Sequence, residues 1–369
     1  MPVPLSILDL APLVSGGTAS DALRRTIDLA RRAEEFGYAR YWVAEHHFTA
    51  GVASSQPALL LGQIAAHTSR IRLGSGAVQT GHQTPLTIVE QFGLIDALHP
   101  GRFDLGIGRS GQRRSAGSDA VSEEPVARIV DGLLIPAPFS FAPLLASSRF
   151  ALSARLLQQP GAEGPDLPEV LDDIQALLTT GITDDEGNEA HAVPGEGADL
   201  EIWILGSSGG LSARVAGERG LPFAANYHVA PAAILEAVEA YRAAFRPSAG
   251  LSEPRVMVSA DVVVADDDET ARHLATPYGP WVRSIRTGQG AIPFPSPEEA
   301  VAFEWSDADR DLVADRIATQ FVGSPPTVAE RLRTLQRVTG ADELLVTTIT
   351  HEHADRVRSF ELLAKEWQS

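Results

Sequence analysis

Cysteine is absent from the 369 residues of the chain. This absence excludes disulfide scaffolds, thiolate metal sites, iron–sulfur clusters and cysteine nucleophiles. Long apolar runs are also lacking, since no stretch approaches the roughly 18 residues typical of a membrane span. The first residues show no basic region ahead of a short apolar run, so no secretory signal is predicted. We therefore expect a soluble, cytoplasmic protein.

Positive charge is scarce as well. Lysine and arginine number 30 against 48 aspartates and glutamates, which gives a formal net charge of −18. Nucleic acids and anionic membranes attract basic patches, so we expect neither as a partner. An anionic ligand would need a local positive site, which directs attention to individual arginines and to helix N-termini.

Strand-like and helix-like patterns alternate along the chain, which predicts a parallel sheet. Eight such units favour closure into a single α/β barrel of the (β/α)8 TIM type over a doubly wound sheet. The expected strands cover residues 3–9, 38–44, 71–78, 102–107, 200–205, 222–225, 256–265 and 343–348. The expected helices cover residues 21–36 (capped by Ser20 and Asp21), 58–66, 85–98, 211–219, 231–245 and 327–338, and a terminal helix follows.

Two long connections interrupt this alternation. Residues 111–199 separate the fourth and fifth strands and contain one expected helix near 168–178, and residues 276–306 follow the seventh strand. Connections after barrel strands lie at the C-terminal face, where active sites are built. We therefore treat residues 1–369 as one domain in which both segments shape a pocket and 276–306 forms a mobile lid. Surface elaboration or an oligomer contact is the alternative.

The second expected strand ends in Glu45-His46-His47-Phe48. Neighbouring residues of a strand face opposite sides, so only one of the two histidines can face the barrel mouth. A histidine in that place suits proton transfer or ligand contact, because its ordinary pKa lies near neutral pH. A structural histidine is the alternative. No further histidine or carboxylate recurs at metal-ligand spacing, so a zinc site is not expected.

Glycines replace bulky residues where the third expected strand ends, in Gly74-Ser75-Gly76-Ala77-Val78. Glycine in a barrel strand indicates either close approach of the backbone to something flat or bulky, or a β-bulge.

The fourth strand ends in Gly106-Ile107-Gly108-Arg109-Ser110-Gly111, which matches the dinucleotide-binding pattern G-x-G-x-x-G. That pattern normally opens a βαβ unit, whereas three units already precede this one, and no apolar-periodic helix follows. We therefore favour a glycine-lined strand end that presents Arg109 to an anion.

The fifth strand ends in Leu205-Gly206-Ser207-Ser208-Gly209-Gly210 and runs directly into a helix. Backbone N–H groups, two hydroxyls and a helix N-terminus together make a phosphate site. The Lys-Ser/Thr ending of a P-loop is missing, and a tight turn that needs only small residues is the alternative. Near the C-terminus, His351-Glu352-His353 is spaced like a metal site, but its position before a helix favours a solvated turn.

Several of these stretches together resemble the bacterial luciferase-like monooxygenases. They are RYWVAEHHF (40–48), IRLGSGAVQTGHQTPLTIVEQFGLIDALHPGRFDLGIGRSG (71–111) and ILGSSGGLSARVAGERGLPFAANY (204–227), which occur in the family's order and spacing. ADELLVTT (341–348) is similar to the family's final strand. The resemblance covers most of the barrel.

The resemblance implies a barrel that binds reduced FMN (FMNH2) at its C-terminal mouth and uses O2 as co-substrate. In it, His46 matches the active-site histidine, a base that helps to form or hold the flavin C4a-hydroperoxide. Gly76-Ala77 matches a non-prolyl cis peptide beside the isoalloxazine ring. The FMN phosphate would be held by Arg109, Ser207, Ser208, Gly209 and Gly210.

The implied reaction inserts one oxygen atom into a small organic substrate by hydroxylation, epoxidation or Baeyer–Villiger chemistry. A separate NAD(P)H:flavin reductase is the expected partner, because no convincing NAD(P)H fingerprint is present. The resemblance also implies a homodimer and suggests a tailoring step in secondary metabolism, such as polyketide biosynthesis. Gly108 stands where light-emitting luciferase subunits carry a reactive cysteine, which argues against light emission and a long-chain aldehyde substrate.

Two alternatives share the same barrel. One is a coenzyme F420-dependent oxidoreductase that transfers hydride without oxygen. The other is a non-catalytic flavin-binding protein, against which the intact Glu45-His46-His47 stretch argues.

Overall fold

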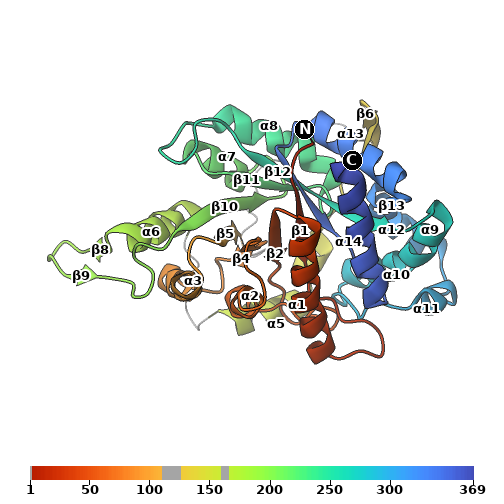
Figure 1. Cartoon of the computed structure of the whole chain (residues 1–369), viewed down its shortest axis with the longest axis horizontal. Helices are drawn as coiled ribbons and strands as arrows, with labels where there is room; N and C mark the ends of the chain where they lie inside the picture. Colours follow the sequence, from red (N-terminus) through yellow and green to blue (C-terminus); the bar gives the residue numbers. More distant parts are fainter. Residues whose placement is uncertain (1, 110–125, 159–165) are drawn as a thin grey trace.

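The computed structural model of the chain describes residues 2–109, 126–158 and 166–369. Eight parallel strands of these residues close into a barrel, because β10 pairs with both β5 and β11 and leaves no free edge. The predicted (β/α)8 barrel is thereby confirmed (Figure 1). The barrel strands are β1 (Leu5–Asp9), β2 (Arg40–Val43), β3 (Arg72–Ser75), β5 (Phe103–Gly108), β10 (Leu200–Gly206), β11 (Phe223–Asn226), β12 (Val256–Val264) and β14 (Glu343–Thr347). Two short strands, β4 (Val78–Gln79) and β13 (Phe321–Gly323), pair in parallel with the C-terminal ends of β5 and β12.

Helices cover the outside of the barrel (Figure 1). They are α1 (Ala19–Phe36), α2 (Pro57–Ala65), α3 (Pro85–Leu98), α7 (Leu211–Glu218), α8 (Ile234–Ala244) with the short 3₁₀ turn η2 (Pro231–Ala233), α13 (Pro325–Thr339) and α14 (His353–Gln368). Each occupies an expected position within a few residues. In the described ranges, no helix is long and apolar enough to cross a membrane.

Two local predictions were wrong. The N-cap of α1 is Thr18 rather than Ser20 or Asp21, and Asp21 is instead the third helical residue, whose carboxylate accepts from the Thr18 N–H in a capping box. The single strand expected over residues 71–78 is divided into β3 and β4, because the chain turns at Gly76-Ala77.

The insertion between β5 and β10 holds more structure than the one helix expected. Its described part contains the hairpin β6 (Arg128–Val130)–β7 (Leu133–Ile135), α4 (Ala142–Leu145), α5 (Ser148–Leu157), α6 (Leu167–Thr179) and the hairpin β8 (Ile182–Thr183)–β9 (Glu189–Ala190). Residues 111–125 and 159–165 of the predicted insertion lie outside the described residues, as do Ser110 and Gly111 of the G-x-G-x-x-G match.

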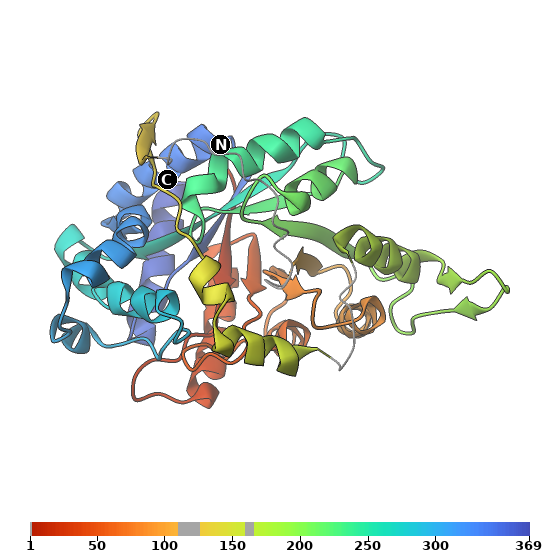
Figure 2. The ribbon, with the colours of Figure 1, turned by 180° about the vertical axis from the view of Figure 1, so that it is seen from behind.

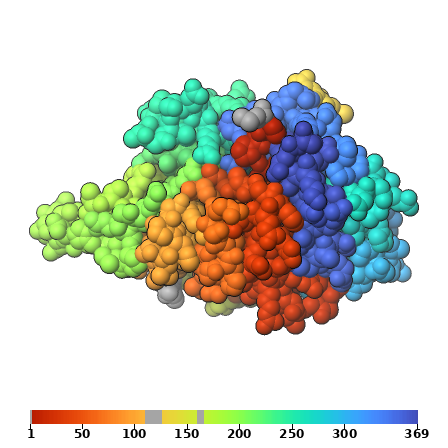
Figure 3. Space-filling model, in the orientation of Figure 1, coloured from red at the N-terminus to blue at the C-terminus, as the bar shows by residue number. Residues whose placement is uncertain are grey.

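The insertion crosses the barrel before it projects outward. Its first hairpin, β6–β7, lies near the end of β11, where the Tyr227 hydroxyl donates to the Leu134 carbonyl (2.8 Å). The chain then returns, and Arg149 of α5 donates to the Phe48 carbonyl beyond β2 (2.8 Å), so these residues span the mouth (Figure 2). Helix α6 and the hairpin β8–β9 extend from the body as an arm (Figure 3).

The connection at residues 276–306 contains two helices that the sequence analysis did not predict, α10 (Tyr278–Arg286) and α11 (Pro297–Val301). They lie between α9 (Asp268–Ala275) and α12 (Asp307–Thr319), which were also not predicted. Trp281 and Val282 of α10 pack with Phe294 and Val313 in a buried apolar cluster. The segment is therefore a packed wall in this structure, and its motion as a lid stays a prediction.

Inward-facing side chains fill the barrel in layers, as the alternation of strand residues requires. At the N-terminal end, the Arg40 guanidinium bonds Asp104 (2.7 Å), Glu201 (2.7 Å) and Glu343 (3.1 Å). Above this layer, the rings of Trp42 and Trp203 meet edge to face with centroids 5.4 Å apart.

Gly74 belongs to this tryptophan layer. A Cβ atom on Gly74 would lie 2.5 Å from Nε1 of Trp42, so the glycine leaves room for the indole ring. The flat group that this glycine was expected to accommodate is thus a side chain of the barrel itself.

Replacement of Arg40 by methionine should destabilise the fold strongly. The change takes one of two arginines from each of the buried carboxylates of Asp104 and Glu343, which keep only Arg72 and Arg255, and breaking a buried ion pair costs about 3–5 kcal/mol. Chemical denaturation of Arg40→Met and wild type measures the difference in the free energy of unfolding. The control is Arg358→Met, whose partners Asp266 and Glu361 are exposed or partly so, and which should change stability by about 1 kcal/mol or less. Equal effects of the two changes would contradict a structural role for the buried layer.

Candidate active site

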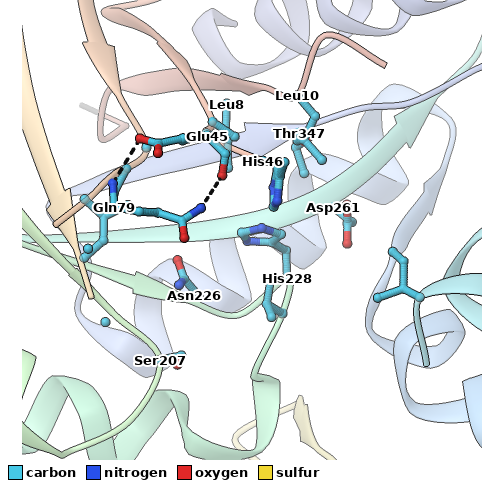
Figure 4. A pocket seen from close by; sticks show the side chains of 18 of the residues that line it. Leu8, Leu10, Glu45, His46, Gln79, Ser207, Asn226, His228, Asp261 and Thr347 are labelled. Carbon is cyan, nitrogen blue, oxygen red and sulfur yellow. Dashed lines mark hydrogen bonds between the residues drawn. The ribbon is translucent and has the colours of Figure 1, made fainter. Parts of the chain in front are cut away.

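A cavity of about 430 Å³ opens at the C-terminal end of the barrel strands (Figure 4). This volume falls in the usual range for small-molecule sites. Six of the eight site residues expected from the sequence line it, namely His46, Gly76, Ala77, Arg109, Ser207 and Ser208. Gly209 and Gly210 are not part of the lining.

Part of the cavity wall is apolar. Leu8 and Leu205, which pack on the tryptophan layer, form its floor. Trp281 and Val282 of α10 form one side, and Phe141 from the insertion contributes from above. Walls of this kind exclude water from a reacting group.

His46 follows β2, and its ring is exposed to the cavity. Its backbone N–H donates to the Ser54 carbonyl (2.9 Å), while the ring has no hydrogen-bond partner among the described residues. The protein around the ring removes water from the charged form, and the neighbouring His47 adds to this effect, so the pKa of His46 falls to about 4. The imidazole is neutral at pH 7 and can accept a proton from a group in the cavity.

The side chain of His47 is not part of the cavity lining, as the alternation of strand residues requires. Its Nε2 pairs with the Glu45 carboxylate (2.9 Å), which is buried. The same carboxylate accepts from the Gln79 backbone N–H (3.0 Å), and the Gln79 side chain donates to the Glu45 carbonyl (2.7 Å). Burial raises the pKa of Glu45, opposed by its bonds to His47 and Gln79. These contacts tie the chain after β2 to β4 and fix His46 in place (Figure 4).

The peptide bond between Gly76 and Ala77 is cis, as the resemblance implies. Both residues line the cavity beside Gly108. A Cβ atom on Gly108 would lie 3.0 Å from Cβ of Ala77, so glycine at this position gives the Ala77 methyl group room.

Arg109, Ser207 and Ser208 line the same cavity, and the two serines lie shortly before α7 in the chain. Gly210 is the N-cap of α7 and supplies no side-chain cap, so the first N–H groups of the helix are open to an anion. Ser212 of the first turn also lines the cavity. Gly209 serves packing: a Cβ atom there would lie 2.8 Å from the Glu236 carboxylate on α8.

The polar lining residues that were not identified from the sequence include His228, Asp261 and Arg316. His228 follows β11, and its Nδ1 pairs with the Ser259 hydroxyl (2.5 Å). Asp261 accepts from the Tyr278 hydroxyl and from Arg316 of α12 (3.2 Å). Asp261 is the charged residue of a strand that is apolar except for Ser259 and Asp261 itself, which is a signal that the sequence does offer.

The pair His351 and His353 lies outside the cavity lining. His351 contacts the Ser15 carbonyl through Nε2 (3.2 Å), and His353 pairs with Asp28 (2.9 Å). Their side chains are only 20% and 21% exposed, so the expectation of a solvated turn was wrong.

A parallel (β/α)8 barrel with a cavity at its C-terminal mouth, lined by a neutral histidine and an arginine, defines a barrel enzyme. The sequence profile of the family described as luciferase-like monooxygenase matches residues 4–134 and 150–343. The chain therefore belongs to the luciferase-like monooxygenase family, and it is a flavin-dependent monooxygenase.

Individual relatives agree with this membership. An uncharacterized Bacillus subtilis protein, YvbT, is 40% identical over 366 residues, which covers 99% of this chain and 97% of that one. A luciferase-like monooxygenase of Escherichia coli is 34% identical over 360 residues, with coverages of 98% and 96%. The crystal structure of apo-MsnO8 has 31% sequence identity and a TM-score of 0.78, and the match covers 99% of this chain and 98% of MsnO8.

More distant structures share only the fold. The oxygenating constituent of 3,6-diketocamphane monooxygenase from Pseudomonas putida, a type II Baeyer–Villiger enzyme in complex with FMN, has 20% identity and a TM-score of 0.67, with coverages of 99% and 98%. An F420-dependent secondary alcohol dehydrogenase has 13% identity and a TM-score of 0.63, with both chains fully covered.

The two cavity histidines should stay neutral far below the usual range. Burial also lowers the pKa of His228 to about 4, with Asp261 raising it and Arg316 and His46 lowering it. NMR titration of the imidazole resonances, assigned with His46→Asn and His228→Asn, should show no protonation of either ring above about pH 5. The unfolded chain binds these protons near pH 6.5, so both histidines should make stability rise with pH between about 4 and 6.5. Midpoints near 6.5 in the folded protein would contradict the burial argument.

Proposed function

We propose that the chain binds reduced FMN at the barrel mouth and uses O2 to transfer one oxygen atom to a small organic substrate. The observation that carries this proposal is that one cavity is lined by Arg109 and Ser207, by the neutral His46 and by apolar side chains such as Trp281 and Val282. The FMN complex of the diketocamphane enzyme, which has the same fold, supports this choice of cofactor.

The residues present fit the phosphate of FMN. The uncapped start of α7 offers backbone N–H groups, and Ser207 and Ser208 add hydroxyls beside it. Arg109 supplies a positive charge in a chain whose net charge is −18. Gly76 and Ala77 place only small groups on the cavity wall, where a flat ring system can approach.

Bound FMN in reduced form supplies the electrons that activate oxygen. The chain itself positions the reactants and controls protons. His46, neutral at working pH, accepts a proton or hydrogen bond at the imidazole nitrogen that faces the cavity. The indole ring of Trp281 and the ring of Phe141 keep water from the reaction site.

Several finer expectations complete the proposal. We infer a homodimer, a separate NAD(P)H:flavin reductase that delivers FMNH2, and a cytoplasmic location. A tailoring role in secondary metabolism also stays a prediction. Because an F420-dependent enzyme shares the barrel, the binding experiment below includes reduced F420 as a competitor.

Replacement of Arg109 by alanine should weaken FMNH2 binding about 10- to 100-fold, because a charge-assisted contact to phosphate is worth about 1.5–3 kcal/mol. Anaerobic titration with photoreduced FMN, followed by fluorescence, measures the dissociation constant. The Arg358→Ala variant, changed at an exposed ion pair, should bind FMNH2 like wild type. Tight binding of reduced F420 with no binding of FMNH2 would contradict the proposed cofactor and support the hydride-transfer alternative.

Replacement of His46 by alanine should leave FMNH2 binding intact. It should change the rate at which oxygen reoxidises the bound flavin and the amount of hydrogen peroxide released. Stopped-flow mixing of the FMNH2 complex with oxygenated buffer gives the rate of flavin reoxidation, and a peroxidase assay gives the hydrogen peroxide released. We expect slow reoxidation in wild type and faster reoxidation with more peroxide in His46→Ala, by about 100-fold in rate if His46 manages protons. His46→Gln, which keeps a hydrogen-bonding group, should lie between the two. Identical time courses for all three proteins would argue for a flavin-binding protein without this chemistry.

A further inference from the structure

A second polar surface faces the cavity, and the proposed function does not use it. His228 lies beside His46 there, with Ser207 and Asp261 on either side of it (Figure 4). This order follows from the sheet, because Ser207 follows β10, His228 follows β11 and Asp261 lies on β12, and these strands are neighbours. His228 therefore stands between the anion site and the apolar wall.

The ring of His228 is held in one orientation. Its Nδ1 pairs with the Ser259 hydroxyl (2.5 Å), which is buried and lies 3.4 Å from the Ala225 carbonyl. No described residue hydrogen-bonds Nε2 of His228. Because burial keeps the imidazole neutral at pH 7, this ring offers one hydrogen-bonding atom and no charge to the cavity.

The charges near His228 are already paired. Arg316 bonds Asp261 (3.2 Å) and the Tyr278 hydroxyl (2.6 Å). Arg286, which also lines the cavity, bonds Asp315 (2.7 Å). An ionic group bound at this end would be taken out of water without a counter-charge, which is costly.

Asn226 and Thr347, which also line this end, are polar but carry no charge, and the remaining lining is apolar. It consists of Val229, Trp281, Val282, Ile285 and Ile349. The last four belong to, or pack against, the cluster that α10 builds over the barrel mouth. Such a wall binds an apolar body by burying its surface.

We propose that His228 is the residue that recognises the organic substrate, and that it selects an uncharged molecule with an apolar body and one hydrogen-bonding oxygen. The word substrate here rests on the proposed function, whereas the binding site rests on the geometry of His228 and its neighbours. Ser259 is a positioning residue, since it acts through the ring of His228.

The test uses octan-2-ol as a probe with oxidised FMN present, on protein labelled with ¹⁵N at histidine. The hydroxyl of octan-2-ol can donate or accept and so suits either tautomer of the ring. We expect a saturable shift of the His228 Nε2 resonance, and an octan-2-ol dissociation constant about 3- to 10-fold higher in His228→Phe, the effect of one lost hydrogen bond. Octanoate, with the same apolar body and a negative charge, should bind at least about 10-fold more weakly than octan-2-ol.

Three further variants of the chain serve as controls. His191→Phe makes the same change on the exposed arm and should bind octan-2-ol like wild type. His228→Gln, which keeps a hydrogen-bonding group, should restore part of the affinity lost in His228→Phe. Ser259→Ala should keep the alcohol-over-octanoate preference but broaden the His228 resonance, because the ring is no longer fixed.

Preferential binding of octanoate, or no shift of His228 with octan-2-ol, would overturn the inference. A loss of FMN affinity in His228→Phe would also overturn it, because it would place His228 at the cofactor. Failure of the proposed function is read separately, from the absence of FMNH2 binding to wild type in the anaerobic titration with photoreduced FMN.

Discussion

The ion network at the closed end of the barrel sets the register on which the rest of the site depends. Arg40 joins carboxylates from three other strands, β5, β10 and β14, while Arg255 reaches two of the same carboxylates, those of Glu201 and Glu343. Because strand residues alternate in direction, the residue that faces inward at the bottom decides which residues face the mouth. On β2 the inward residues after Arg40 are Trp42 and Ala44, and His46 follows at the cavity. A slip of one residue would send His46 outward and His47 inward.

The order of strands and helices could be predicted because each of these elements carries its own local pattern. The prediction of helices failed where the local sequence suggests a different structure from the one that forms. Helix α10 begins with Tyr278-Gly279-Pro280, residues that usually end a helix, yet proline is tolerated in a first turn because its missing N–H needs no partner there. The helices of the insertion were missed for another reason. Helices α4 and α5 have no buried residues, so their sequences carry no strong apolar period.

Sequence reasoning identified only those cavity residues that stand at the ends of barrel strands. His46, Arg109 and Ser207 stand at strand ends in motifs that the sequence shows directly. Arg316 lies on α12, a helix outside the expected set, and its partnership with Asp261 is a tertiary contact that no spacing reveals. Gly74 shows the opposite error. The glycine was correctly taken to make room, but its neighbour is Trp42 of the adjacent strand rather than a bound molecule.

The cavity has two ends that are built by different parts of the chain. The anion end uses a strand end, a glycine-serine turn and the start of α7, all of which belong to the barrel repeat itself. The apolar end uses α10 and Phe141, which belong to connections outside that repeat. Connections can change without disturbing strand register, because the network around Arg40 lies at the other end of the barrel. One barrel can therefore keep the proposed phosphate site while its substrate range changes with the connections. His228 stands at the boundary between the two ends, fixed by Ser259 of β12, so its own position is set by the barrel, whereas the apolar surface around it is not.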